Sequence, residues 1–523
     1  MLRRFLTGSR IIFLPFLAAL FLLPNAQAKD IWRKVESENF TVVGNSSERN
    51  LLRVASRLEK FRHAFVILFP TYEFNSSVPT RVLVYRDERS FRPVAPRRNG
   101  KPVKNLAGYF RRGETANYIV IHSPGAARQN DFLDRLIFHE YTHFLIRNML
   151  QTTPAWLSEG LAEYFSTFQI RGRGKKAYLG WPIEDHIRLL RKGRLLPLRV
   201  LLRVDHSSPY YNERDKKGIF YAQSWALVHY LIEGELGLRR RLLPRLAALL
   251  ASGTPPEQAL IEALEMDFVT LEKALRRYVG NRVSYPARLL TFSNRLQFET
   301  HTESFLLSEA DAQYFQGALL ANGRRERYPD AETFLQKAIR LDPEHSASHA
   351  ALGRLRTRQG RLAEAKQHLE RAVRAKSPGT LAHYYYAWVH SISELKQTPN
   401  GGVSFLYRNT YPPELRERLR KELQEAIRLA PRFADSYYLL GRMELQKGGE
   451  LDSAVVHLTR AWLLEPGRNR YTFTLAGAYM RKRDPKNARA LLKPLAQAGD
   501  SPEIRERARK RLETLDRYFP PEE

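Results

Sequence analysis

The hydrophobic positions of the chain change their period along the sequence, and each change marks a different kind of structure. Short β-branched runs bounded by turn residues predict strands within residues 29–128, and the helical spacing of apolar residues over Ser47–Phe69 predicts an amphipathic helix among them. From residue 129 to 282 the spacing is mostly helical. We therefore expect an α+β N-terminal region with a small mixed or antiparallel sheet. The expected strands are Asn39–Gly44, Arg81–Tyr85 and Asn117–Ile121.

A repeated pattern begins at about residue 306 and continues to about residue 515. Pro378 lies 35 residues after Pro343, and Pro466 lies 35 residues after Pro431. Within each unit, small residues at fixed offsets would let the two helices of a hairpin approach closely, and the proline would end the second helix. The two fullest units carry Leu352, Gly353, Ala365, Leu369 and Ala372, and then Leu440, Gly441, Ala454, Leu458 and Ala461.

This pattern resembles the tetratricopeptide repeat, in about four to five copies over residues 306–515. The resemblance implies an all-α solenoid whose concave face binds a protein partner. An insertion near residues 398–414, rich in Pro, Gly and Asn, is expected to loop out of one copy. Residues 283–305 show no clear period and are predicted to be a linker, and residues 516–523 a tail. In a second interpretation, the array only braces the N-terminal region.

The candidate chemistry begins with His139-Glu-Tyr-Thr-His143, inside a predicted helix over Asn130–Leu150. On a helix the two histidines fall about 40° apart on one face and about 6 Å apart along the axis, so both imidazoles can converge on one cation. Glu140 is close enough to reach a water molecule at that cation without being a ligand. Neutral imidazole suits zinc. The alternative is a pair of histidines packed on a helix that binds nothing.

A second predicted helix follows, with Thr153 as its cap and Pro154 at its first position. Fifteen residues separate His143 from Glu159, which is enough for the first helix to end and the chain to return antiparallel. Glu159 can then supply a third ligand, and Glu163, one turn later, can accept the free N–H of a ligating histidine. The alternative is a solvated acidic stripe, but apolar residues surround both carboxylates, and a buried carboxylate without a partner is costly. These neighbours are Trp156, Leu157, Leu161 and Phe165, with Gly160 placed to let the helices pack closely.

Residues 35–282 resemble the gluzincin branch of zinc metallopeptidases, especially bacterial domains of the peptidase-MA-like type. That family carries HExxH followed by W-x-x-E-G-x-A-E-Y, which His139–His143 and Trp156–Tyr164 match. The spacing to the third ligand is shorter than in thermolysin-like enzymes. The resemblance implies a zincin-like fold with one Zn²⁺ ion per chain. It assigns His139, His143 and Glu159 as metal ligands and Glu140 as general base and acid. It assigns Glu163 as the residue that accepts a hydrogen bond from a ligating histidine.

Two further segments resemble parts of the same family. Tyr221 begins a segment similar to the helix on which related aminopeptidases carry an oxyanion-stabilising tyrosine, which implies that Tyr221 donates a hydrogen bond to the tetrahedral intermediate. Packing at a helix start is the alternative for Tyr221, and His229 is expected to be a packing residue. Gly108 and Tyr109 lie in a segment that resembles the hairpin whose edge strand binds substrate backbone by strand addition. Recognition glutamates of the aminopeptidase type are not evident, so an endopeptidase is expected.

The amino-acid composition excludes several kinds of functional site and bears on the class of partner. The 523 residues contain 85 Lys+Arg against 55 Asp+Glu, a formal net charge of +30, and no cysteine. Disulfides, thiolate metal sites and cysteine nucleophiles are therefore excluded. The charge suits either an anionic envelope surface or basic residues spread over solvated faces. Since no nucleic-acid-binding motif accompanies the charge, we expect no nucleic-acid partner.

Residues 1–28 are predicted to be a secretory signal peptide, with a basic start, an apolar stretch over Ile11–Leu23 and a small-x-small cleavage site at Ala26–Ala28. The alternative is an uncleaved membrane anchor, although the apolar stretch is shorter than the roughly 20 residues that a spanning helix needs. No later segment is apolar enough to span. We expect export, to the periplasm first, with an extracellular or envelope-associated location as the alternatives.

Three functions fit these observations. The first is an exported zinc endopeptidase that hydrolyses peptide bonds and whose repeats recruit a substrate or partner. The second is a repeat scaffold of the cell envelope with a non-catalytic peptidase-like module. The third is hydrolysis of another amide, such as a peptidoglycan cross-link. The complete set of His139, Glu140, His143 and Glu159 favours the first, since a site that has lost its activity has no need of the base.

Overall fold

A six-stranded mixed sheet forms the centre of the N-terminal half in the computed structural model. Its strand order is β11-β1-β2-β3-β7-β6, with β2, β3 and β7 parallel and the outer strands antiparallel to their neighbours. The predicted strands of the N-terminal half are confirmed to within one residue at each end. The six strands are β1 Arg33–Glu36, β2 Phe40–Gly44, β3 Thr80–Tyr85, β6 Gly108–Arg111, β7 Asn117–His122 and β11 Ser304–Leu306.

The structure describes residues 30–69, 78–98, 100–103, 106, 108–122, 127–149, 153–192, 195–205, 207–212, 214–234, 242–280, 285–292, 304–375, 379–397, 411–446, 450–499 and 501–520. The expected signal peptide and residues 398–410 of the expected insertion lie outside these ranges. From Trp32 to Glu523 the chain forms one unit. None of the helices within the described ranges is long and apolar enough to cross a membrane.

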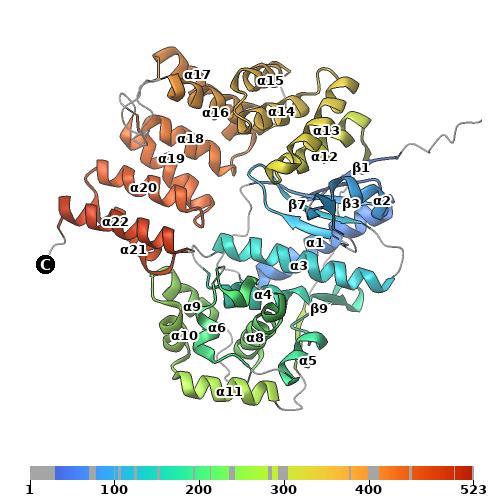
Figure 1. The fold of residues 1–523 in the computed structure, drawn as a ribbon, viewed down its shortest axis with the longest axis vertical. Coiled ribbons are helices and arrows are strands. Elements are labelled where there is room, and N and C mark those ends of the chain that lie inside the picture. Colours follow the sequence, from blue (N-terminus) through green and yellow to red (C-terminus); the bar gives the residue numbers. More distant parts are fainter. Residues whose placement is uncertain are drawn as a thin grey trace, which may run out of the picture. The chain divides into compact units, whose positions relative to one another are not determined.

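Both faces of the sheet are covered, which explains why its central strands are apolar at nearly every position. In β3, Val82 and Val84 belong to the core beneath α1 Glu48–Leu68 and α3 Ala127–Met149. The alternate residues Leu83 and Tyr85 belong to a second core, on the opposite face, with α12 Glu309–Ala321 and α13 Tyr328–Leu341. Figure 1 shows these two pairs of helices on the two sides of the strands.

The described part of residues 283–305, the predicted linker, contains two strands. Residues Arg288–Thr291 form β10, which pairs with β9 in a small antiparallel sheet of order β10-β9-β8. Residues Ser304–Leu306 form β11, which pairs with β1 at the edge of the large sheet. The segment thus connects the two halves through strand pairing, and α12 then packs directly on the sheet. The other short strands are β4 Arg97–Arg98, β5 Lys101–Pro102, β8 Gln169–Arg171 and β9 Lys176–Leu179.

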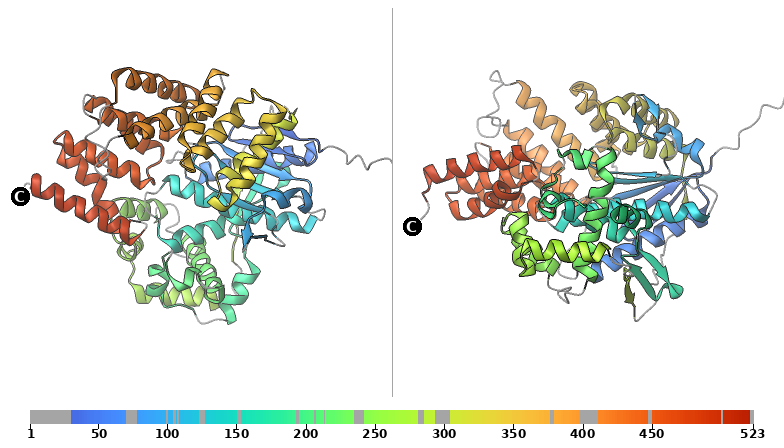
Figure 2. Two further views of the ribbon diagram at one scale, coloured as in Figure 1. Left: turned by 45° about the horizontal axis from the view of Figure 1, so that its top comes forward. Right: turned by 60° about the horizontal axis from the view of Figure 1, so that its bottom comes forward.

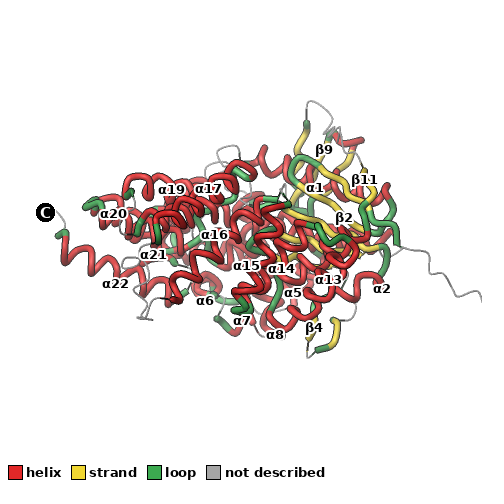
Figure 3. The backbone as a smooth tube through the Cα atoms, turned by 90° about the horizontal axis from the view of Figure 1, so that it is seen from above, coloured by secondary structure: helices red, strands yellow, loops and turns green. Residues whose placement is uncertain are grey.

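Helices make up most of the remaining N-terminal half, and the yellow strands of Figure 3 are confined to one part of the molecule. Pro154, not Thr153, is the N-cap of α4, and no side chain caps that helix, because the proline ring carries no oxygen to accept a hydrogen bond from the first helical N–H groups. The helices are α2 Glu88–Phe91, α4 Ala155–Ser166, α5 Glu184–Lys192, α6 Leu198–Arg203, α7 Pro209–Asn212, α8 Arg214–Glu233, α9 Leu242–Ala251, α10 Pro256–Leu264 and α11 Phe268–Gly280, with short 3₁₀ turns at Arg92–Val94 and Gly172–Gly174.

The C-terminal half is a series of helix hairpins, visible from two further directions in Figure 2. The small residues of the repeat do what their spacing predicts: a Cβ built on Gly353 would lie 2.6 Å from Leu369 Cγ, and one on Gly441 would lie 2.8 Å from Leu458 Cγ. Each glycine therefore allows the two helices of its hairpin to touch. After α12 and α13, the helices are α14 Ser346–Arg358, α15 Leu362–Arg374, α16 Thr380–Gln397, α17 Pro413–Leu429, α18 Ala434–Glu444, α19 Leu451–Leu464, α20 Asn469–Arg481, α21 Pro485–Ala498 and α22 Pro502–Tyr518.

Candidate metal centre

The candidate site lies where α3 and α4 pack against each other, with α8 behind α4. The close contact between α4 and α8 depends on Gly160, because a Cβ at this position would lie 2.4 Å from the carbonyl oxygen of Ser224 in α8. A larger residue would push the two helices apart. The predicted close packing at Gly160 is thus present, and it holds α4 against a rigid support.

Three side chains from α3 and α4 converge at this point. The Nε2 atoms of His139 and His143 are 3.1 Å apart, and the Oε2 atom of Glu159 lies 3.5 and 3.2 Å from them. In the described part of the chain, these residues form the single group of three possible metal donors, with all donor atoms within 4.8 Å of one another. Donors bound to one zinc ion at about 2.1 Å in tetrahedral geometry are about 3.4 Å apart. The observed separations match that spacing.

The opposite nitrogen of each imidazole faces a polar partner. His143 Nδ1 is 2.9 Å from the Ser158 hydroxyl, and His139 Nδ1 is 3.5 Å from Glu163 Oε1. Glu163 Oε2 in turn lies 3.3 Å from His186 Nε2 and 4.0 Å from Arg135. These contacts turn both Nε2 atoms toward Glu159, which is the orientation that a shared cation requires.

Glu159 is 3 % exposed, so its carboxylate is almost fully removed from water. Burial alone raises its pKa, but the two adjacent imidazoles hold the pKa of Glu159 well below its usual range. For His139 the signs are reversed. Burial by itself lowers the pKa of His139, but Glu159 and Glu163 raise that pKa above its ordinary value. The buried Oε2 atom of Glu159 makes no hydrogen bond of normal geometry. A carboxylate oxygen left in this state has one position open for a cation.

The other predicted site residues lie around this cluster. Glu140 is half-buried, and its charge acts on both His139 and Tyr211. The ring of Tyr221, in α8, is stacked on His139 with 6.4 Å between centroids. Burial, followed by the charge of Glu159, raises the pKa of Tyr221 well above 10, so its hydroxyl keeps its proton.

Gly108 and Tyr109 lie in β6, which is the edge strand that the resemblance implies for binding of substrate backbone. Gly108 packs against β7, where a Cβ would lie 2.7 Å from the carbonyl oxygen of Val120. The side chain of Tyr109 belongs to the core on the opposite face of the sheet, and its hydroxyl donates a hydrogen bond to the carbonyl oxygen of Val94 at 2.8 Å. What β6 offers is its backbone, since it is the edge strand of the sheet and α3 packs against it.

The sequence interpretation missed three residues of this region. Tyr211 donates a hydrogen bond to Glu159 Oε1 at 2.8 Å from the short helix α7, and Ser158 and His186 hold the cluster from outside. Ser158 precedes Glu159 directly, so its place facing His143 follows from the antiparallel helices. Tyr211 and His186 stand outside any periodic pattern. His229 is a packing residue as expected: it is fully buried between the Gly180 carbonyl and the Tyr278 hydroxyl, and burial lowers its pKa to about 4.

Comparisons with known proteins give a different family for each half of the chain. Residues 319–385 match the family described as tetratricopeptide repeat. The match supports tetratricopeptide repeats within residues 319–385. Residues 136–239, which include the whole cluster and Tyr221, match a family described as a protein of unknown function (DUF1570). No curated protein sequence matches the chain significantly.

Two of the solved structures similar to the chain are described as tetratricopeptide proteins. YrrB, described as having an unusual peptide-binding site, is 18 % identical, with 38 % of this chain and 92 % of YrrB covered and a TM-score of 0.28. A thermophilic tetratricopeptide protein from Thermus thermophilus is 21 % identical, with 39 % and 98 % covered and a TM-score of 0.30. Yeast Tom70 is 13 % identical, with 75 % of each chain covered and a TM-score of 0.29.

Proposed function

We propose that the chain is a zinc-dependent metallopeptidase of the gluzincin type, with the tetratricopeptide array as its protein-interaction part. The observation that carries this proposal is the convergence of His139 Nε2, His143 Nε2 and Glu159 Oε2 within 4.8 Å. The match between this region and a family of unknown function supplies no activity, so the proposal rests on the geometry of the cluster and on the motif.

The residues present fit a divalent cation by three criteria. The donor set of two imidazoles and one carboxylate is typical of catalytic zinc sites with an open fourth position. The buried Oε2 atom of Glu159 lacks a hydrogen bond. Ser158 and Glu163 occupy the outer nitrogens of the two imidazoles and leave the Nε2 atoms for the ion. Other first-row metals bind the same set, so zinc is the first candidate among several.

The reaction proposed is hydrolysis of a peptide bond by water. A zinc ion at the cluster would polarise the substrate carbonyl and lower the pKa of water to near 7. Glu140 accepts a proton from the attacking water as the new C–O bond forms, and it returns the proton to the amine nitrogen as the C–N bond breaks. Glu140 suits this role because it follows His139 on α3 and is half-buried.

Two tyrosines would assist. Tyr221 lies against His139 with a protonated hydroxyl, so it can donate a hydrogen bond to the negative charge that develops on the former carbonyl oxygen. Tyr211 holds Glu159 Oε1 by its hydrogen bond and so keeps Oε2 directed at the imidazoles. Tyr211 is therefore a positioning residue, and Tyr221 the proposed catalytic one.

A second candidate function has its own support. Tetratricopeptide repeats bind protein partners, and the array is the part of the chain that the comparisons characterise. In this alternative the protein is a scaffold of the cell envelope with a non-catalytic peptidase-like module. Export, by the predicted signal peptide, is common to both proposals, as is attraction of the basic chain to anionic envelope surfaces.

Metal content and peptide hydrolysis distinguish the two candidates. We expect the purified wild-type protein to hold about one equivalent of zinc and the Glu159→Ala variant to hold none, because three donors are reduced to two. Glu233→Gln is the matched control: Glu233 is also a buried carboxylate, but it is paired with Arg288 at 2.8 Å and with the Tyr164 hydroxyl. If the purified wild-type protein binds no metal, the metallopeptidase proposal fails and the scaffold function is the remaining candidate.

A fluorescent-peptide assay and a digest of muropeptides then define the substrate. Cleavage of peptides with L-residues supports the metallopeptidase, whereas release of fragments from muropeptides alone would assign the activity to cell-wall amides. Glu140→Gln is the reference variant in both assays, since it should retain zinc and lose turnover. Hydrolysis at the wild-type rate by Glu140→Gln would contradict the proposed mechanism.

A further inference from the structure

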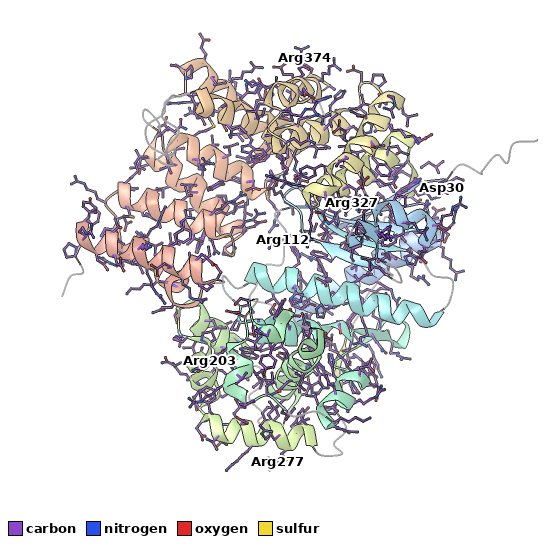
Figure 4. All side chains as sticks on the ribbon, in the orientation of Figure 1. Asp30, Arg112, Arg203, Arg277, Arg327 and Arg374 are labelled. Carbon is purple, nitrogen blue, oxygen red and sulfur yellow. The ribbon has the colours of Figure 1, made fainter. Side chains whose placement is uncertain are left out.

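The turn between β6 and β7 contacts repeat helices that lie far apart in the sequence. Thr115 is within hydrogen-bond distance of Asn322 at the end of α12, at 3.3 Å. Glu114 faces α14, and Arg112 lies 4.0 Å from Glu465, the residue that follows α19. Arg112 is labelled in Figure 4. A turn of five residues thus reaches three different hairpins of the array.

Glu114 is held by two arginines of one helix. Its Oε2 atom is 2.9 Å from Arg358 and 3.4 Å from Arg354. Arg354 is 3 % exposed and also donates a hydrogen bond to Asn322 Oδ1 at 2.9 Å. Burial alone would raise the pKa of Glu114, but the two guanidinium groups hold it below its usual range. The carboxylate therefore stays charged near neutral pH and bound to the array.

The repeat array also contacts the strands on both sides of the turn. Arg111, the last residue of β6, lies 3.4 Å from the carbonyl oxygen of Leu319 in α12. At the start of β7, Tyr118 accepts a hydrogen bond from Asn322 at 3.3 Å. Since β6 is an edge strand with a single partner, β7, these contacts supply support that a second neighbouring strand would otherwise give.

We infer that the repeat array acts as an intramolecular clamp, in which Arg354 and Arg358 hold the β6–β7 turn through Glu114, and Asn322 holds it through Thr115. The clamp thereby fixes the edge strand β6 beside α3. The existence of this clamp is independent of the proposed function, whereas its effect on catalysis rests on it. The three residues and Glu114 are positioning residues, because none of them lies in the cluster of metal donors.

The catalytic consequence follows from how a strand binds an edge. A peptide that adds to β6 needs a row of backbone N–H and C=O groups in fixed register. If the edge strand is loose, each binding event has to order it, and the free energy of ordering is lost from binding. Loss of the clamp should therefore raise KM by roughly three- to tenfold and leave kcat nearly unchanged.

Hydrogen–deuterium exchange tests the clamp without any activity. In Glu114→Gln we expect amides of residues 108–122 to exchange about tenfold faster, because a charge-assisted contact is lost from the turn, while β2 exchanges as in the wild type. Arg361→Gln is the matched control. Arg361 lies in the same helix hairpin as Arg354 and Arg358, but it pairs with Glu364 instead of Glu114. Unchanged exchange over residues 108–122 in Glu114→Gln would overturn the inference.

A double variant tests whether Glu114 and the array act as a pair. Arg358→Gln alone should accelerate exchange of the same segment, and Glu114→Gln combined with Arg358→Gln should exceed the larger single effect by less than about twofold, since the second change removes a contact already lost. Additive effects would overturn the pairing. If exchange responds as expected but wild-type protein hydrolyses no peptide, the clamp stands and the proposed function fails.

Discussion

Glu159 in the candidate metal centre and Asp435 in the repeat array are buried to the same degree, at 3 % and 4 % exposure, but their partners differ in kind. Asp435 binds the guanidinium of Arg470 and the hydroxyl of Tyr471. The partners of Glu159 include two imidazoles and the hydroxyl of Tyr211. Arginine is charged at every accessible pH, so the pair in the array is complete by itself.

An imidazole, in contrast, loses its charge near neutral pH. The partners of Glu159 are therefore groups that can share a metal ion with it, and the three donor atoms lie within 4.8 Å of one another. This difference distinguishes a contact that stabilises the fold from a group of residues suited to hold an ion. The predictions below test that distinction.

The largest effect is expected from Glu140, which contributes chemistry rather than structure. Glu140→Gln should reduce kcat for peptide hydrolysis by at least about 100-fold, because general acid–base catalysis typically contributes 10²- to 10⁴-fold. Zinc content and thermal stability should match the wild type. The measurements are steady-state kinetics with a fluorescent peptide and metal analysis of the same preparation. A variant that loses zinc together with activity would point to a structural role for Glu140.

The next prediction compares the two buried carboxylates directly. Zinc at a thousandfold excess over its Kd should stabilise the wild type by about 4 kcal/mol, and it should not stabilise Glu159→Ala. Asp435→Asn should lower the free energy of unfolding by about 1–2 kcal/mol with or without zinc, since the buried carboxylate loses its charge-assisted contacts to Tyr471 and to the exposed guanidinium of Arg470. Denaturant unfolding with zinc and with a chelator measures both. Equal responses of the two variants to zinc would remove the distinction between the regions.

His229 is a buried imidazole outside the candidate metal centre, so it can be compared with the histidines of that centre. Its neighbours are a carbonyl and a phenol rather than carboxylates, and burial lowers its pKa from 6.5 to about 4. The folded state therefore favours neutral His229, so its contribution is complete above pH 6.5 and is lost as the pH falls toward 4. Between pH 7.5 and 4.5 the wild type should lose about 2–3 kcal/mol more stability than His229→Gln, measured by urea unfolding. Parallel pH profiles would contradict the assignment.

The smallest effect concerns packing within the array. Gly441→Ala places a Cβ 2.8 Å from Leu458 Cγ and should destabilise the protein by about 1–2 kcal/mol through overpacking. The control is Gly280→Ala at the end of α11, where a Cβ meets no atom within 4 Å. That change should be neutral or stabilising by less than about 1 kcal/mol. Thermal unfolding of the two variants gives the difference, which should vanish if the hairpin relaxes freely.

Local signals in the sequence are sufficient to predict the cluster. His139 and His143 share a helix face because of the helical period alone, and the motif Trp156–Tyr164 places Glu159 on the returning helix. The repeat is equally readable, because Gly353 and Gly441 occupy the same place in two hairpins. In each case the information lies within about forty residues of sequence.

Interactions between distant segments are not readable in this way. β10 and β11 are four and three residues long, and their partners β9 and β1 lie more than 100 and more than 260 residues earlier in the chain. Such short strands show no clear alternation, so the sequence pattern of residues 283–305 predicts a linker instead. The hydrogen bond from Tyr211 to Glu159 is of the same type, since it joins a four-residue helix to α4 across 52 positions.

The pairing of β11 with β1 also determines where the polypeptide can be shortened. A fragment that stops at residue 282 would lack Ser304–Leu306 and would leave Arg33–Glu36 as a bare edge. It would also expose the apolar surface of Leu83 and Tyr85 that α12 and α13 cover. Such edges and patches promote aggregation. The N-terminal half is thus best isolated with the first helix hairpin attached, by ending the polypeptide after Leu341.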